Sequence, residues 1–458
     1  MAAPAETSTL FRPPAPTPLK KPLSMLGVLR QLRKDPLTTW TQTHFEKPIV
    51  VVEGFFGHVA VLSDPAAIRH VLVDNAFNYR KDDLQRRILA PTMGNSLFTA
   101  EADEWRVQRR ALAPLFARRT VSGFGPAMAV AADRIVQRLR RRGKGREVDI
   151  ALEMTRVALD VLERTIFTHG VARDPGSLSV AIGRYFEAIG RIDPLDLLGF
   201  PDWLPRIARI RSRPALRFFE GLVDELVGVR RALIDGGDTP PNDLMTLLLQ
   251  AADPETGRPL TDLEVRANII AFLAAGHETT ANALSWSLYL LSQTPDIRDR
   301  VEREVDAAGD ATEASDYPVT RAVFEEAMRL YPPIPVITRT AIGDDRVAGF
   351  RIPKGSFVMI PPYVLHRHKL LWTEPDAFDP DRFMPGRREA IDRLAYLPVG
   401  AGPRVCIGAS FSIQEGVIVL SRLLRAVRLD MKPGVVPNPL HRVTLRPAGG
   451  LPMIIRLR

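Results

Sequence analysis

Apolar residues recur at helical spacing along much of the chain. Clear runs extend over residues 128–142, 148–167, 261–294 and 411–427. Positions three and four residues apart lie on one side of an α-helix, so each run predicts a helix with a buried face. The chain is therefore expected to be mainly helical.

Short runs rich in β-branched residues lie near both ends of the chain. Residues 49–53 and 58–62 are separated by Gly54 and Gly57 and predict a hairpin. Residues 349–360 alternate around a Pro-Lys-Gly turn. Residues 443–450 suggest a further hairpin with its turn at the later glycines. A smaller β region is therefore expected beside the helices.

The longest helical run, residues 261–294, predicts a central element. It opens on the capping-box sequence from Thr261 to Glu264. About thirty residues at a rise of 1.5 Å each give a helix on the order of 45 Å, long enough to cross the molecule. Gly276 and Thr279 share one face near its middle, where a threonine hydroxyl can bond a carbonyl or a ligand. Taken alone, this pattern fits an ordinary buried helix equally well.

Two proline-rich stretches interrupt the helical pattern. Residues 1–22 are rich in Ala, Pro and Thr and predict a flexible N-terminal tail without the apolar core of a signal peptide. Residues 192–205 form an apolar loop broken by prolines. No run approaches the ~18 apolar residues of a membrane span. We therefore expect a soluble, cytoplasmic protein.

The positive charge of the chain raises the question of whether it binds an acidic partner. The 458 residues are 45% hydrophobic and 25% charged, with a net charge of +9. Arginine and lysine concentrate in residues 106–119 and 138–146. Such runs commonly form a solvated face, and the functional alternative is a surface that attracts an acidic protein. No nucleic-acid-binding motif accompanies the charge, so nucleic acid is not an expected partner.

Cys406 is the only cysteine in the chain. A single cysteine excludes an internal disulfide, a four-cysteine zinc site and a cysteine-ligated iron–sulfur cluster. It follows a turn with two glycines and precedes the apolar run 411–427, so its thiolate would lie at the positive end of a helix. From the residues alone, Cys406 could also be a buried apolar side chain or a catalytic nucleophile. A metal that takes one thiolate from the protein is most simply a haem iron.

The surrounding spacing, Gly402-x-Arg404-x-Cys406-x-Gly408, resembles the haem-binding loop of the cytochrome P450 monooxygenases. Four further motifs resemble that family in order and spacing. They are Trp105-x-x-x-Arg109, Ala275-Gly276-x-Glu278-Thr279, Glu326-x-x-Arg329 and Pro380-x-Arg382-Phe383. The resemblance implies a cytochrome P450 fold, mainly α with a smaller β region, in which the haem lies between the long central helix and the helix after the cysteine. It also implies one domain over residues 23–458 after the tail of residues 1–22.

The resemblance assigns expected roles. Cys406 would be the axial ligand of haem b, in a loop shaped by Gly402 and Gly408. Val399 stands where the family usually has Phe, which predicts a less shielded sulfur. Glu278 and Thr279 would manage protons beside Ala275 and Gly276. The other expected sites are propionate partners (Trp105, Arg109, Arg339, Arg404), a substrate pocket (Leu97, Ala275, Ile334, Val336, Val443) and a buried network (Glu326, Arg329, Arg382).

The activity implied is insertion of one oxygen atom from O2 into a hydrophobic substrate, by hydroxylation or epoxidation. The apolar pocket favours a fatty acid, a terpene or a similar molecule. No flavin or nicotinamide domain fits in the chain, so electrons are expected from a ferredoxin or flavodoxin with its NAD(P)H reductase. The alternatives are a haem-thiolate sensor without turnover, a peroxide-using enzyme of the same fold and a cysteine hydrolase.

Overall fold

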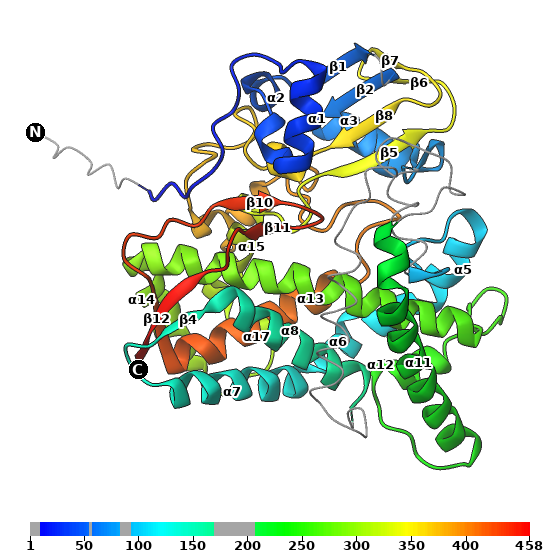
Figure 1. The fold of residues 1–458 in the computed structure, drawn as a ribbon, viewed down its shortest axis with the longest axis vertical. Coiled ribbons are helices and arrows are strands. Elements are labelled where there is room, and N and C mark those ends of the chain that lie inside the picture. The colour runs from blue at the N-terminus through cyan, green and yellow to red at the C-terminus, as the bar shows by residue number, and fades with distance from the viewer. Residues whose placement is uncertain (1–9, 55–56, 83–92, 169–206) are drawn as a thin grey trace, which may run out of the picture.

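A body of packed helices carries a β-rich lobe at one end (Figure 1). The structure is a computed structural model that describes residues 10–54, 57–82, 93–168 and 207–458. The expectation of a mainly helical chain with a smaller β region is confirmed. The described α-helices are α1 Met25–Lys34, α2 Gln42–Glu46, α3 Pro65–Arg69, α5 Ala102–Leu112, α6 Arg118–Ser122, α7 Gly125–Arg142, α8 Ile150–Ile166, α11 Ile207–Asp235, α12 Leu244–Leu249, α13 Asp262–Gln293, α14 Pro295–Ala308, α15 Pro318–Leu330, α16 Pro362–Leu365 and α17 Ala409–Ala426.

Helix α13 crosses the middle of the body, as its sequence predicts (Figure 1). Its capping box is formed: the Thr261 hydroxyl accepts from the Glu264 backbone N–H, and the Glu264 carboxylate accepts from the Thr261 backbone N–H. At 1.5 Å per residue, its 32 residues span about 48 Å. The helix is buried over most of its length and packs against α8, α15 and α17. It therefore provides a rigid wall through the centre of the molecule.

The β lobe is built on a five-stranded sheet with strand order β1-β2-β8-β5-β3. The predicted N-terminal hairpin is confirmed, since Ile49 pairs with Leu62 in an antiparallel register. The described strands are β1 Ile49–Gly54, β2 Gly57–Leu62, β3 Tyr79–Arg80, β4 Glu147–Asp149, β5 Ile337–Ala341, β6 Asp345–Val347, β7 Phe350–Ile352, β8 Phe357–Ile360, β9 Val427–Met431, β10 Pro439–His441, β11 Leu445–Pro447 and β12 Pro452–Leu457.

Two strand predictions need correction. The Pro-Lys-Gly turn does not join a hairpin, because β7 pairs with β6 whereas β8 pairs with β2 and β5. The C-terminal hairpin exists, but its turn is at residues 442–444, between β10 and β11, and not at the later glycines. Alternation shows that a segment is extended but does not choose its partner strand, which explains the first error.

Residues 10–22, the described part of the predicted tail, lie against the body. The Tyr331 hydroxyl donates to the Pro14 carbonyl at 2.7 Å, and the Phe11 ring meets the Tyr289 ring edge-on at 6.3 Å. The proposed domain boundary at residue 22 stays a prediction. The predicted loop at residues 192–205 lies outside the described residues.

Candidate active site

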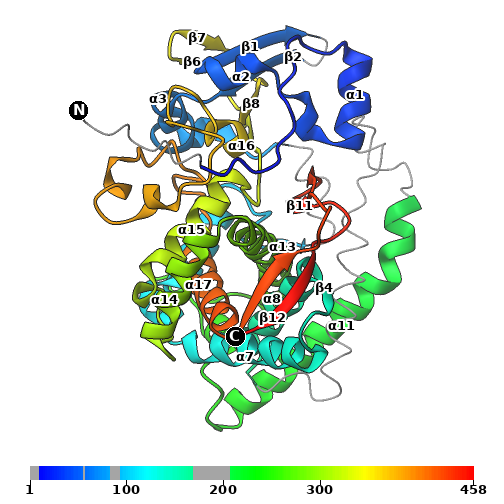
Figure 2. The same ribbon diagram turned by 90° about the vertical axis from the view of Figure 1, so that its left-hand side faces the viewer.

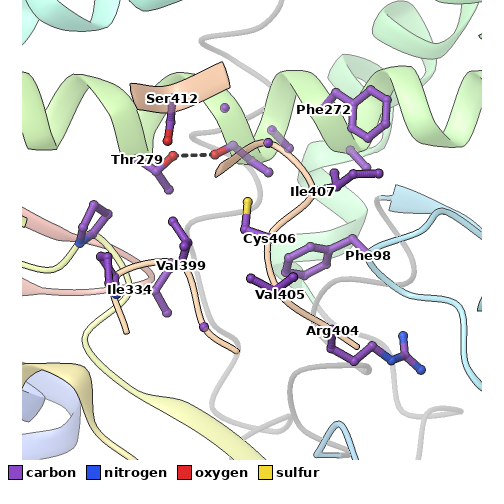
Figure 3. Close-up of a pocket in the computed structure, with 18 of the residues that line it drawn as sticks. Phe98, Phe272, Thr279, Ile334, Val399, Arg404, Val405, Cys406, Ile407 and Ser412 are labelled. Atoms are coloured by element: carbon purple, nitrogen blue, oxygen red, sulfur yellow. Dashed lines mark hydrogen bonds between the residues drawn. The ribbon is translucent and has the colours of Figure 1, made fainter. Parts of the chain in front are cut away.

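A cavity of about 420 Å³ lies between α13 and the loop that precedes α17. Most of its wall is apolar, and the loop, α13 and the segment before β5 all contribute (Figure 3). The predicted residues that line it are Leu97, Trp105, Arg109, Ala275, Gly276, Glu278, Thr279, Ile334, Val336, Arg339, Val399, Arg404, Cys406, Gly408 and Val443. Gly402 and the network residues Glu326, Arg329 and Arg382 are not among the lining residues.

The loop holds the thiol of Cys406 toward the cavity. Gly400 and Gly402 have φ angles of 77° and 72°, a conformation that only glycine adopts freely. The Cys406 backbone N–H donates to the Val399 carbonyl at 3.0 Å, which closes the turn. Figure 3 shows the sulfur directed toward α13, on which Thr279 lies. The α17 helix begins at Ala409, three residues later.

The thiol environment favours a charged sulfur only when a partner is bound. Burial raises the pKa of Cys406, while the Gly408 backbone N–H and the positive charge of Arg109 act in the opposite direction. The surface that Cys406 exposes faces the cavity and not bulk water. A cation in the cavity would therefore stabilise the thiolate, which is the electron-rich form.

The two predicted loop glycines have separate steric roles. A Cβ on Gly402 would collide with the carbonyl oxygen of Leu72, which belongs to the π-helical turn His70–Asp74 (η2). A Cβ on Gly408 would lie 3.9 Å from the Cys406 sulfur, beside the position of any metal. Gly402 thus lets the lobe touch the loop, and Gly408 keeps the space around the sulfur open.

Thr279 faces the sulfur from α13. Its hydroxyl donates to the Ala275 carbonyl at 2.7 Å, the bond dashed in Figure 3. With its proton used in this bond, the Thr279 oxygen presents acceptor lone pairs to the cavity. Gly276 lines the cavity beside Thr279 and also contacts the neighbouring helix. A Cβ there would lie 3.2 Å from Leu162, so the glycine allows close packing of α13 on α8.

Glu278 points to the C-terminal hairpin. Its carboxylate accepts a hydrogen bond from the Thr444 hydroxyl at 2.8 Å and lies 3.9 Å from an Arg446 guanidinium nitrogen. Its side chain remains about one-third exposed (32%). The carboxylate therefore connects the cavity to the surface beside β11.

The predicted propionate partners contact protein groups in this structure, and Arg339 donates to the Thr338 carbonyl at 2.8 Å. Arg109 donates to the Val405 carbonyl at 3.0 Å. Arg404 donates to the Ala100 carbonyl and pairs with Glu101 at 2.5 Å, and its guanidinium lies 4.1 Å from the centre of the Trp105 ring. These contacts fix the two arginines around the loop, and binding to propionates stays a prediction.

Lys81 is a cation that the sequence analysis missed. It lines the cavity near Arg339 and Arg404, and its ammonium donates to the Phe98 carbonyl. Burial, together with the charge of Arg404, lowers the pKa of Lys81 to about 7. Burial also lowers the pKa of Arg339. An isolated lysine directly after the short strand β3 has no motif spacing that would reveal it.

The cavity fits a haem. Within the described part of the chain, neither Lys81 nor Arg339 pairs with a carboxylate, although both are desolvated. Two carboxylates on a bound group would supply the missing negative charge. Cys406 faces the same cavity, and the described residues contain no cluster of three or more His, Cys, Asp or Glu side chains that could hold a metal. A flat anionic group with its own metal ligands matches this set.

The predicted substrate residues lie on the cavity wall. Ile334 and Val336 come from the segment before β5, and Val443 comes from the turn between β10 and β11. Leu97 is anchored because its backbone N–H donates to the Asn268 side chain of α13 at 2.8 Å. Phe116 and Phe272 add an aromatic edge, with ring centres 5.0 Å apart. An apolar ligand is favoured on this side.

The predicted network is buried behind the loop. Arg329 binds Glu326 through two hydrogen bonds of 2.7 Å and donates to three backbone carbonyls. Both side chains are fully buried. Arg382 approaches Glu326 at 3.6 Å.

His366 joins this network to the cysteine loop, which the sequence analysis did not foresee. Its Nδ1–H donates to the Arg329 carbonyl, and its Nε2 accepts from the Leu397 backbone N–H at 2.8 Å. Burial and the charge of Arg329 lower the pKa of His366 to about 3, so the ring is neutral. The start of the loop is therefore fixed by a neutral imidazole.

Glu415 on α17 is a second residue that the pattern concealed. It is buried, and burial raises its pKa well above the ordinary value, opposed by the Thr280 hydroxyl. Thr280 lines the cavity, so the carboxyl group of Glu415 lies one side chain away from it. The sequence signal that could have revealed Glu415 is an acidic residue on the apolar face of the run at residues 411–427.

Comparisons with known proteins agree with this geometry. The family model described as Cytochrome P450 matches residues 16–451. Cyclooctatin synthase of Streptomyces melanosporofaciens is 34% identical over 401 residues, covering 85% of this chain and 84% of that protein. Pentalenene oxygenase of Streptomyces avermitilis is 31% identical and covers 77% and 78%. The crystal structure of the cytochrome P450DA heme domain superposes with a TM-score of 0.84 at 27% identity, over 98% of each chain.

Proposed function

The chain belongs to the cytochrome P450 family of haem-dependent monooxygenases, and from this premise we propose that it inserts one oxygen atom from O2 into a polycyclic hydrocarbon such as a terpene. The observation that carries the proposal is the Cys406 thiol facing Thr279 across an apolar cavity. Bound haem supplies the activation of O2 at its iron. The protein residues hold the haem, position the substrate and move protons.

We propose that residues of four segments bind the haem: the loop before α17, the segment after β3, β5 and α5. Cys406 would bind the iron, and its thiolate would supply electron density to it. Lys81 and Arg339 would meet the propionates directly, since both are desolvated and lack a carboxylate partner among the described residues. Trp105, Arg109 and Arg404 would complete that side. The form of the haem is proposed to be haem b.

Proton handling is assigned to the middle of α13. The Thr279 oxygen is an acceptor toward the cavity, so it can hold a proton-bearing ligand in place. Glu278 reaches from the cavity to the hairpin surface and can take protons from there. Glu415, whose pKa burial raises, lies next to Thr280 of the cavity wall and is a further candidate. Positioned groups of this kind contribute about 10²–10⁴-fold in proton-transfer steps.

The substrate class follows from the cavity and from the relatives. Its wall is largely apolar and includes Phe98, Phe116 and Phe272, which favours a rigid hydrocarbon. Two relatives carry the names cyclooctatin synthase and pentalenene oxygenase. Titration of the haem absorption band with cyclic terpenes and with fatty acids tests this choice. Tighter binding of the fatty acids would contradict it.

Thr279→Ala tests the proposed mechanism. The variant is expected to bind haem and substrate but to form about tenfold less product per NAD(P)H, with hydrogen peroxide in its place. Ser285→Ala is the matched control, because Ser285 donates to the Ala281 carbonyl of the same helix at 2.7 Å and does not line the cavity. Parent-like coupling in Thr279→Ala would remove Thr279 from the mechanism.

Electrons are proposed to come from an acidic ferredoxin or flavodoxin with its reductase. Arg118 and Arg119 are exposed on α6, which packs against α17 and so lies near the cysteine loop. We place the enzyme in the cytoplasm, where such donors occur. Among the described helices, none combines the length and apolar character needed to cross a membrane. The sensor alternative is not favoured, because the similar proteins are named as a synthase and an oxygenase.

A further inference from the structure

Helix α1 has an apolar stripe that the protein does not bury. Met25, Val28, Leu29 and Leu32 follow helical spacing and therefore share one face. In a surface helix of a globular protein this face normally packs on the core. None of the ten residues of α1 is buried, and Met25 and Leu32 are 49% and 43% exposed. Val28 and Leu29 are half-buried, so the described structure covers only part of the stripe.

The charge around α1 has a single sign. Residues 10–34 contain six cations and neither Asp nor Glu. Five of these cations have no carboxylate partner among the residues that the structure describes: Lys20, Lys21, Arg30, Arg33 and Lys34. The next acid, Asp35, is 8% exposed and turns inward, accepting from the backbone N–H groups of Leu37 and His441. A partner for this face must therefore be both apolar and anionic.

We propose that α1 binds the surface of an anionic membrane, with the helix lying in the plane of the headgroups. A short amphipathic helix with Leu and Met on one face and Arg and Lys on the other matches the boundary between acyl chains and headgroups. Leu26, which is 76% exposed, lies between Arg30 and Arg33 on the basic face and is not part of the stripe. An acidic protein fits less well, because α1 carries no aromatic residue, the type that most often anchors a protein interface.

The position of α1 connects this surface with the cavity. The Arg442 guanidinium donates to the Arg33 carbonyl at the end of α1, at 2.8 Å. The next residue, Val443, lines the cavity and is 41% exposed. Figure 2 shows α1 on the same side of the molecule as β11. An apolar substrate dissolved in the membrane would thus meet the cavity wall close to the lipid.

Sedimentation with vesicles tests the proposal on the haem-loaded full chain. The parent is expected to bind vesicles of phosphatidylcholine mixed with phosphatidylglycerol, and to bind pure phosphatidylcholine much less. Arg30→Gln with Lys34→Gln should weaken binding by about fivefold per charge, on the order of 25-fold in total. Arg140→Gln with Arg141→Gln, at the exposed end of α7, removes the same charge elsewhere and should have little effect.

A second pair of substitutions, with its own control, tests the apolar contribution of α1 to vesicle binding. Met25→Ser with Leu32→Ser should weaken binding at least about tenfold, whereas Leu263→Ser, at a 67% exposed position on α13, should not. Absence of binding to the anionic vesicles would overturn the proposal, as would equal losses in the α7 pair, which would indicate diffuse charge. Self-association without lipid that the α1 variants abolish would also overturn it, because the stripe would then join two copies. Turnover in detergent-free buffer should stay unchanged in the α1 variants, so this test fails or succeeds independently of the proposed function.

Discussion

At the scale of single residues, the site depends on a few backbone conformations and buried polar groups. Cys406, Thr279 and the Glu326–Arg329 pair could be predicted because their motifs fix residue type and spacing. Lys81 could not, because it becomes special only when tertiary packing desolvates it, and the place of Glu415 on an apolar helix face signals burial without identifying the groups around it. A local pattern carries no information on which distant groups remove water from a side chain.

Gly402→Ala tests the close contact between the lobe and the loop. A Cβ there collides with the Leu72 carbonyl, and the φ angle of 72° is strained for alanine. The free energy of unfolding of the haem-loaded protein should fall by roughly 3 kcal/mol in urea. Gly434→Ala is the control, since its φ is 76° with nothing within 4 Å, and strain alone costs about 1 kcal/mol. Equal losses in the two variants would contradict the steric role of Gly402.

At the scale of elements, the sequence predicts where an element begins if the residues that begin it are close together in the chain. The α13 capping box lies in four consecutive residues, so its start could be predicted. The partners of β7 and β8 could not, because pairing depends on strands distant in the sequence. His366 shows the same limit: it links α15 to the loop before Cys406 across segments that no local pattern connects.

The His366 link predicts a pH dependence of stability. Its pKa falls from 6.5 to about 3 on folding, so the unfolded chain binds the proton more tightly. The stabilisation is therefore complete above about pH 6.5 and is lost as the pH falls toward 3, by about 1.4 kcal/mol per pH unit. In His366→Gln, the amide oxygen can still accept from the Leu397 backbone N–H. Between about pH 6 and 4, the free energy of unfolding in urea should therefore depend on pH less steeply in the variant than in the parent, by about 1.4 kcal/mol per pH unit. Parallel curves for parent and variant would contradict the assignment.

At the scale of the whole molecule, the arginine-rich runs separate into different environments. Arg138 and Arg142 bind the buried Glu153, so part of the second run is structural. Arg118 and Arg119 lie on α6 near the cysteine loop, whereas Arg140 and Arg141 lie at the end of α7 beside β4 (Figure 1). The sequence gives the total charge, but only the fold distributes it over surfaces.

This distribution predicts where the electron donor docks. Arg118→Gln with Arg119→Gln should lower the second-order rate of reduction by an acidic ferredoxin roughly tenfold at low ionic strength. The difference should shrink as salt screens the charges. Arg140→Gln with Arg141→Gln serves as the control and should reduce at the parent rate. Equal rates for all three proteins would contradict docking over α6.

The account depends most on the bond between Cys406 and the iron, and the spectrum of the reduced protein with carbon monoxide tests that bond most directly. We expect the parent to show the long-wavelength band of a thiolate-ligated haem. Cys406→Ser should lose this band, and Ser412→Ala, which alters another residue of the cavity wall, should keep it. A parent spectrum typical of an imidazole-ligated haem, or a parent protein that takes up no haem, would contradict the account.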